Sequence, residues 1–287
     1  MADLHLQLLG RPMVRSSRSA APEPVPPSLQ PLFAFLTLAG DAGCHRSRLI
    51  DSLWPDLPSD HARRRLNTAV WRSRNLFGVD HAEAIVATRS GHIALDATIV
   101  AVDVAPMVQA LGDEGRAAAA RAEPAALDLL RRAVRIDASQ LLAGNDDEWV
   151  VQARHHMELA VLNGVATLLA VAAHADEAIG WAELLVRLDP LREDAHRQLI
   201  RLYAEAGRRA DALRQYDRCV RHLRDDLGVE PLVETTLVAT AVRQGIAPPP
   251  PDAPDARRAL CELREALVSC QVAVEHIESA LASLPPG

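Results

Sequence analysis

The feature that most constrains the fold is the hydrophobic pattern from residue 104 onward. There the apolar residues recur at i, i+3 and i+4, which is the spacing of one face of an α-helix. Helices without strands between them bury their apolar faces against one another, so this region is predicted to be all-helical. The pattern indicates helices at residues 104–111, 124–136, 147–173, 176–188, 193–206, 209–224 and 231–243.

Within this helical region, two sets of packing residues are 34 residues apart, the period of a tetratricopeptide repeat. Gly207 separates the two helices of the second copy, and Pro190 falls at the closing position of the first. Such repeats present concave surfaces to partners, so this half is predicted to be an interaction or regulatory module. The packing residues are Val165, Leu169, Ala178, Ala182 and Leu185 in the first copy and Leu199, Tyr203, Ala212, Tyr216 and Cys219 in the second.

The first hundred residues follow a different order, which is strand, three helices and hairpin. Residues 4–9 alternate like a half-buried strand, and residues 16–28 contain too much Pro, Ser and Ala to be regular structure. Helices are predicted at 29–39, at 45–56 and from Ser59 or Asp60, as the N-cap, to Phe77. Residues 84–96 form two strands about a turn at Ser90 and Gly91.

The third of these helices carries five arginines and one acid, Asp60, although the chain has a formal net charge of −7. At about 100° per residue, the helix buries one narrow face and exposes the opposite one. Arginines cover both flanks of the exposed face. The buried face holds Leu66, Val70, Ser73 and Phe77, and the exposed face holds Arg64, Thr68, Trp71 and Asn75.

A recognition helix in a DNA major groove has this arrangement, with phosphate-binding cations on its flanks and base-reading residues outermost. The alternative is a solvated basic helix face. Residues 1–100 carry a net charge of +2 and the rest −9, which favours an anionic partner for the first domain alone. We predict phosphate contacts from Arg63, Arg65, Arg72, Arg74 and, on the hairpin wing, Arg89, and base-edge contacts from Arg64, Asn67, Thr68 and Trp71.

Composition excludes several classes of protein. All 31 basic residues are arginine, so a P-loop and lysine-based catalysis are ruled out. Neither the four cysteines nor the eleven histidines have metal-ligand spacing, and no nucleophile motif is present. We therefore expect no enzyme activity, no cofactor and no metal. No segment is apolar enough to span a membrane, and a cytoplasmic location is expected.

The last thirty residues form a separate predicted element, a helix at 256–287 that follows a Pro-rich spacer at 246–255. Its apolar residues are spaced alternately by three and four, as in a coiled coil, which predicts self-association. The alternative is a helix that folds back to cap the repeat domain. The seam consists of Leu260, Leu263, Leu267, Cys270, Val274, Ile277, Leu281 and Leu284.

The first domain resembles an OmpR/PhoB-type winged helix, in the version found in the Streptomyces antibiotic regulatory protein (SARP) family, and the resemblance to that family covers roughly residues 3–243. The stretch that carries this resemblance runs "RSRLIDSLWPDLPSDHARRRLNTAVWRSRNLF" and continues to "IVATRSGHIALD". The segment "RLDPLREDAHRQLIRLYAEAGRRADALRQYDRCVRHLRDDLGVEP" resembles the bacterial transcriptional activator domain of that family. Trp71 and Ser73 replace the usual Ser and Leu, and His92 and Ala94 replace the usual Tyr and Arg of the wing.

The resemblance implies a transcription activator that binds promoter repeats and contacts RNA polymerase, including its sigma factor. By the same resemblance, the loop of Pro55, Asp56, Leu57 and Pro58 is a candidate polymerase contact. The expected fold is mainly α, with a winged helix at 1–101, a tetratricopeptide-like domain at 102–245, a linker at 246–255 and the oligomerisation helix. The competing interpretation is an interaction scaffold or adaptor whose winged helix does not bind DNA.

Overall fold

The computed structural model describes residues 2–17, 21–88 and 90–248. By their contacts they form two compact units, the first ending at Leu188 and the second beginning at Asp189. The described strands all belong to the first unit. They are β1 (Leu4–Gln7), β2 (Met13–Ser16), β3 (Glu23–Pro24), β4 (Cys44–His45), β5 (Ile85–Ala87), β6 (His92–Leu95) and β7 (Val100–Val102).

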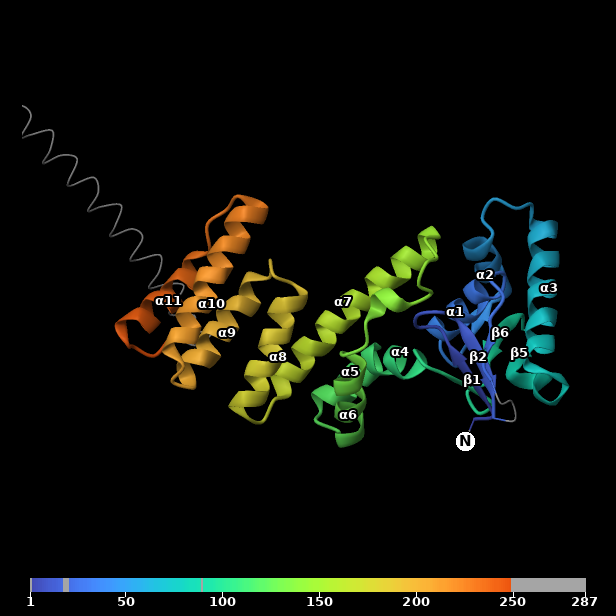
Figure 1. Cartoon of the computed structure of the whole chain (residues 1–287), viewed down its shortest axis with the longest axis horizontal. Coiled ribbons are helices and arrows are strands. Elements are labelled where there is room, and N and C mark those ends of the chain that lie inside the picture. The colour runs from blue at the N-terminus through green and yellow to red at the C-terminus, as the bar shows by residue number, and fades with distance from the viewer. Residues whose placement is uncertain (1, 18–20, 89, 249–287) are drawn as a thin grey trace, which may run out of the picture. The chain divides into compact units, whose positions relative to one another are not determined.

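Two small sheets frame the N-terminal part of the first unit (Figure 1). One has the order β3-β2-β1-β7, in which β1 pairs antiparallel with β2 and parallel with β7. The other is an antiparallel sheet of order β4-β6-β5, and its β5–β6 hairpin is the predicted wing. The parallel pairing of β1 with β7 therefore closes the N-terminal fold on itself.

Three helices pack against strands of the second sheet: α1 (Gln30–Leu38) against β6, α2 (Arg46–Leu53) against β4 and α3 (Ser59–Phe77) against β5. Phe33 of α1 and Phe77 of α3 stack with ring centroids 5.2 Å apart, and both side chains are buried. This aromatic contact and the apolar residues around it fix one side of α3 against the core, so the opposite side faces outward.

Two details differ from the sequence-based expectations in this region, and one agrees with them. The segment 16–28, predicted to lack regular structure, contains the end of β2 and all of β3. Neither Ser59 nor Asp60 is the N-cap of α3; Pro58 holds that position, and no side-chain cap hydrogen bond forms there. The predicted stop at Gly78 is correct, because that glycine ends α3 with a φ of +88°.

The rest of the first unit is helical and runs from α4 to α8, as predicted except for one additional helix, α5. In the first repeat, Val165, Leu169, Ala178, Ala182 and Leu185 are all buried, as its packing pattern requires. The helices are α4 (Ala105–Leu111), α5 (Asp113–Ala120), α6 (Pro124–Ala133), α7 (Glu148–Val171) and α8 (Ala175–Leu188).

The described part of the second unit contains α9 (Glu193–Glu205), α10 (Arg209–His222) and α11 (Val233–Gln244). Gly207 turns the chain between α9 and α10 with a φ of +73°. Burial lowers the pKa of His196, whose Nε2 lies 2.9 Å from the carbonyl oxygen of Pro190. The predicted tail helix at 256–287 lies outside the described residues.

Candidate nucleic-acid interface

The third helix has the two-sided character that its sequence predicts. Its buried residues include Leu66, Val70, Ser73 and Phe77. Ser73 is fully buried and donates a 2.8 Å hydrogen bond from Oγ to the carbonyl oxygen of Ala69, so its hydroxyl is satisfied within the helix. A polar residue at this core position therefore leaves α3 intact.

The opposite side of α3 is open to solvent, as the wheel geometry predicts. The indole of Trp71 is 61 % exposed, a high value for the largest apolar side chain. The residues exposed along this side are Arg64, Asn67, Thr68, Trp71 and Asn75. Side chains on one rigid helical face that is free of covering elements are able to reach the base edges of a duplex.

Arginines flank this open side, and the structure holds some of them loosely in place. Arg63 lies 3.7 Å from Asp60, with both side chains mostly exposed. The Arg65 guanidinium lies 5.9 Å from the ring centroid of Trp54, in cation–π geometry. Arg72 is also exposed. Such weakly engaged cations can exchange their present contacts for phosphate oxygens at little cost.

Arg74 has a different environment from the other predicted phosphate contacts. It is half-buried, its Nη2 donates to the carbonyl oxygen of Ile85 at 3.4 Å, and its Nε is buried with no hydrogen-bond partner among the described residues. Ile85 begins β5, so this contact of Arg74 joins α3 to the β5–β6 hairpin that follows it.

The wing is a tight hairpin held by polar contacts at its tip. Thr88 Oγ1 accepts a 3.0 Å hydrogen bond from the backbone N–H of His92, and the backbone N–H of Thr88 donates to the carbonyl oxygen of His92 at 2.8 Å. Gly91 takes a φ of +85°, as the predicted turn requires. Arg89, the predicted wing contact, lies outside the described residues.

The loop between α2 and α3 presents a small exposed surface just before the start of α3. Pro55, Asp56 and Pro58 are exposed, and Leu57 is half-buried. The backbone N–H of Leu57 donates to the carbonyl oxygen of Trp54 at 3.2 Å, which fixes the turn. The loop is therefore accessible to a protein partner.

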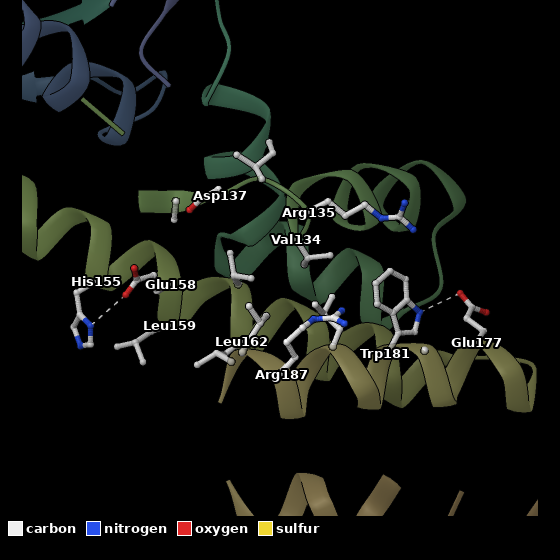
Figure 2. A pocket seen from close by; sticks show the side chains of 16 residues that line it. Val134, Arg135, Asp137, His155, Glu158, Leu159, Leu162, Glu177, Trp181 and Arg187 are labelled. Atoms are coloured by element: carbon white, nitrogen blue, oxygen red, sulfur yellow. Dashed lines mark hydrogen bonds and ion pairs between the residues drawn. The ribbon is translucent and has the colours of Figure 1, made fainter. Parts of the chain in front are cut away.

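A groove of about 970 Å³ lies between α7, α8 and residues 134–138 in the first unit, which we call the α7–α8 groove (Figure 2). The sequence alone did not predict it, because its walls come from three separate segments, residues 134–138, 155–162 and 177–188. Leu159 and Leu188 on its walls are each 45 % exposed. Gly180 also lines it, and a Cβ built there meets nothing within 4 Å.

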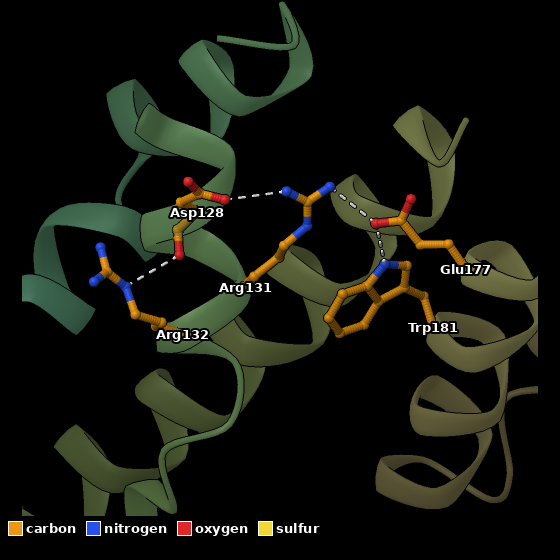
Figure 3. Close-up of polar contacts among 5 residues, drawn as sticks. All are labelled: Asp128, Arg131, Arg132, Glu177 and Trp181. Carbon is orange, nitrogen blue, oxygen red and sulfur yellow. Dashed lines mark hydrogen bonds and ion pairs between the residues drawn. The ribbon is translucent and has the colours of Figure 1, made fainter. Parts of the chain in front are cut away.

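The charged side chains that line this groove differ in their hydrogen-bond and ion-pair partners. Glu177 accepts hydrogen bonds from Arg131 at 2.9 Å and from the indole of Trp181 at 3.3 Å, and these donors lower its pKa (Figure 3). Asp137 accepts from the backbone N–H of Ser139 at 3.0 Å. Glu158, a third acid of the lining, lies 3.8 Å from His155, and the exposed arginines Arg135 and Arg187 complete the charged lining of the groove.

The described part of the chain can also be assessed for metal sites, reactive thiols and membrane-spanning helices. Residues 2–17, 21–88 and 90–248 hold no group of three or more His, Cys, Asp or Glu arranged for a metal ion. Burial raises the pKa of Cys44 and raises that of Cys219 to about 12, so both thiols stay protonated at neutral pH. None of the described helices has the length and hydropathy of a membrane span.

The fold and this basic helix define a winged-helix protein with an α-helical repeat domain. Residues 102–243 match the family model of the bacterial transcriptional activator domain. The regulatory protein AfsR of Streptomyces coelicolor is 28 % identical over 209 residues, covering 71 % of this chain and 21 % of AfsR. AfsR of Streptomyces griseus is 29 % identical over 214 residues, covering 72 % and 21 %. Residues 102–243 therefore contain a bacterial transcriptional activator domain, and the chain is similar to the AfsR regulatory proteins.

The chain spans about a fifth of the length of these curated relatives. Among solved structures, Mycobacterium tuberculosis EmbR in complex with a low-affinity phosphopeptide aligns with a TM-score of 0.60. The identity is 23 %, and the match covers 94 % of this chain and 72 % of that one. At this identity the likeness establishes a shared fold.

Proposed function

We propose that the chain is a DNA-binding transcriptional activator. In this proposal the winged helix (residues 1–101) binds promoter repeats, and the repeat domain (102–245) helps recruit RNA polymerase, including its sigma factor. The helix at 256–287 assembles copies through the seam of Leu260, Leu263, Leu267, Cys270, Val274, Ile277 and Leu281. The observation that carries DNA binding is the exposed face of α3, with arginines along both edges. The predicted phosphate contacts stay Arg63, Arg65, Arg72, Arg74 and Arg89.

The test of DNA binding is a salt titration of the Arg72→Ala variant. Losing one phosphate contact should weaken binding to the DNA upstream of the chain's own gene and to random duplex alike, and lower the slope of log K against log salt by about one. Arg218→Ala, which removes an exposed arginine of α10, is the matched control and should leave the slope unchanged. An unaltered slope for Arg72→Ala would remove this arginine from the interface.

Polymerase recruitment is tested separately, at the loop between α2 and α3. Asp56→Arg reverses the charge of an exposed loop residue without touching the buried side of α3. We expect transcription from a bound promoter in vitro to fall toward its basal level, because the loop no longer matches its partner, while the affinity for DNA stays within about twofold. Retained activation in this variant would place the polymerase contact elsewhere.

The α7–α8 groove favours a second candidate function, that of an interaction scaffold. Its exposed leucines suit the apolar face of a partner helix, and its exposed arginines, Arg135 and Arg187, suit acids beside that face. The probe is a synthetic peptide with leucines at heptad positions a and d and glutamates beside them, and its twin has lysine for each glutamate. We expect the glutamate peptide to bind the full chain more tightly by fluorescence anisotropy.

Gly180→Leu supplies the decisive variant for the groove. It places a side chain into open space on a helix, so it should occupy the groove without unfolding α8 and weaken the peptide at least tenfold. Ala170→Leu, at an exposed position on α7 outside the groove, is the control. Equal binding by both variants and the original chain would show that the peptide does not enter the groove.

A further inference from the structure

The centre of the exposed face of α3 is apolar, although arginines surround it. Trp71 is 61 % exposed and lies between Arg64 and Asn75 along the outward side of the helix. An indole this exposed leaves most of its area in contact with solvent, and it has one hydrogen-bond donor and no acceptor. A side chain of this kind gains free energy only when a partner covers its ring.

Thr68 precedes Trp71 by three residues, so the two side chains are neighbours on the helix surface. The Thr68 hydroxyl donates to the carbonyl oxygen of Arg64 at 2.9 Å, and this bond uses its one donor. The pair therefore offers a ligand an aromatic ring and a methyl-bearing side chain, with the indole N–H as its remaining donor.

The helix holds this apolar spot in a fixed orientation. Leu66 and Val70 are buried on the far side, and Phe77 stacks on Phe33 at the C-terminal end. The hydrogen bond from Arg74 to the carbonyl oxygen of Ile85 ties the same helix to the wing. A side chain on a helix that is held rigidly in this way has a defined position along the groove of a duplex.

In the major groove, the prominent apolar group on the base edges is the 5-methyl group of thymine. We infer that Trp71, with Thr68 beside it, recognises thymine through that methyl group. The inference rests on the proposed DNA binding and names the sequence class of the site, which has one or two thymines opposite the middle of α3. The flanking arginines contribute affinity at this position, and the indole contributes the choice of base.

The experiment replaces thymine by deoxyuracil, which removes the methyl group and leaves the hydrogen-bonding edge unchanged. The full chain first selects its preferred duplex from a random pool, and each thymine is then exchanged singly. Covering one methyl group corresponds to about a fourfold change in affinity. We expect a loss of about this size at one or two thymines for the original chain, a similar loss for Trp71→Phe, and none for Trp71→Ala.

Arg72→Ala is the matched control, because a phosphate contact is indifferent to the base methyl. It should bind all duplexes more weakly and keep the fourfold uracil effect. Tolerance of uracil at every position by the original chain would overturn the inference while leaving DNA binding in place. An equal uracil effect in Trp71→Ala would also overturn it, since the methyl would then be read by another residue. Failure to enrich any duplex would overturn the proposed function itself.

Discussion

Gly43 determines the course of the backbone immediately before β4. It precedes β4 and takes a φ of +65°, and a Cβ at this position would lie 2.4 Å from the carbonyl oxygen of Ile93 in β6. Three residues earlier, Gly40 has a φ of +69° but meets nothing within 4 Å. The two glycines share the same backbone requirement and differ in the space around them.

This difference predicts unequal costs of substitution. Gly40→Ala should destabilise the fold by about 1–2 kcal/mol, the cost of a left-handed backbone for alanine. Gly43→Ala should cost clearly more, because β4 must also move away from β6. Urea unfolding of the two variants measures the comparison. Equal losses in the free energy of unfolding for the two variants would mean that β4 can move away from β6 near Ile93 without a measurable cost.

At the scale of elements, the contacts of Glu177 join α6 to α8. Its carboxylate accepts from Arg131 of α6 and from Trp181 of its own helix. Both donors favour the ionised acid and so lower its pKa. Arg131 also reaches Asp128 at 3.2 Å, so one guanidinium connects two acids from two helices (Figure 3).

A lowered pKa gives this link a defined pH dependence. The contribution of Glu177 to stability is present above the pKa that it has when unfolded, and it is lost as pH falls through the lower folded value. We expect Glu177→Gln to lower the thermal midpoint by a few degrees at pH 7 and by progressively less toward pH 3. Glu205→Gln, at an exposed position of α9, should lack this trend. A loss that does not change with pH would contradict the ionic origin of the link.

At the scale of the whole molecule, the chain divides its charge between its parts. Residues 1–100 are net positive and the remainder is strongly negative, so the long-range field favours DNA for the first part alone. If the helix at 256–287 assembles copies, each assembly would present several basic helices to repeated promoter sites, and linked binding raises the apparent affinity.

Self-association predicts a change in mass when the seam is broken. Replacing Leu267 and Val274 with Asp places charges inside the predicted coiled coil, so sedimentation of the full chain should give a smaller particle. Replacing Ser269 and Ser279 with Asp adds the same charge outside the seam and should leave the mass unchanged. An unchanged mass in the seam variant would favour the cap interpretation of this helix.

Much of the local structure was predictable from neighbouring residues. The two faces of α3, the stop at Gly78 and the hairpin turn at Gly91 follow from helical period and turn chemistry within one segment. The additional helix α5 was missed because its "DEGRAAAA" sequence carries no apolar period and buries Ala119 alone. The strand β7 was missed because its three residues give too short a pattern.

The sequence by itself determined most of the helical segments, where the arginines gather and which side of α3 faces outward. These properties depend on spacings of a few residues, so they are encoded locally. The tertiary structure alone decided that β7 lies beside β1, that Arg74 contacts Ile85 and is half-buried, and that Glu177 neutralises Arg131 at the edge of a groove. Each of these joins segments that are distant in sequence or belong to different elements, and their distances follow from how the elements pack.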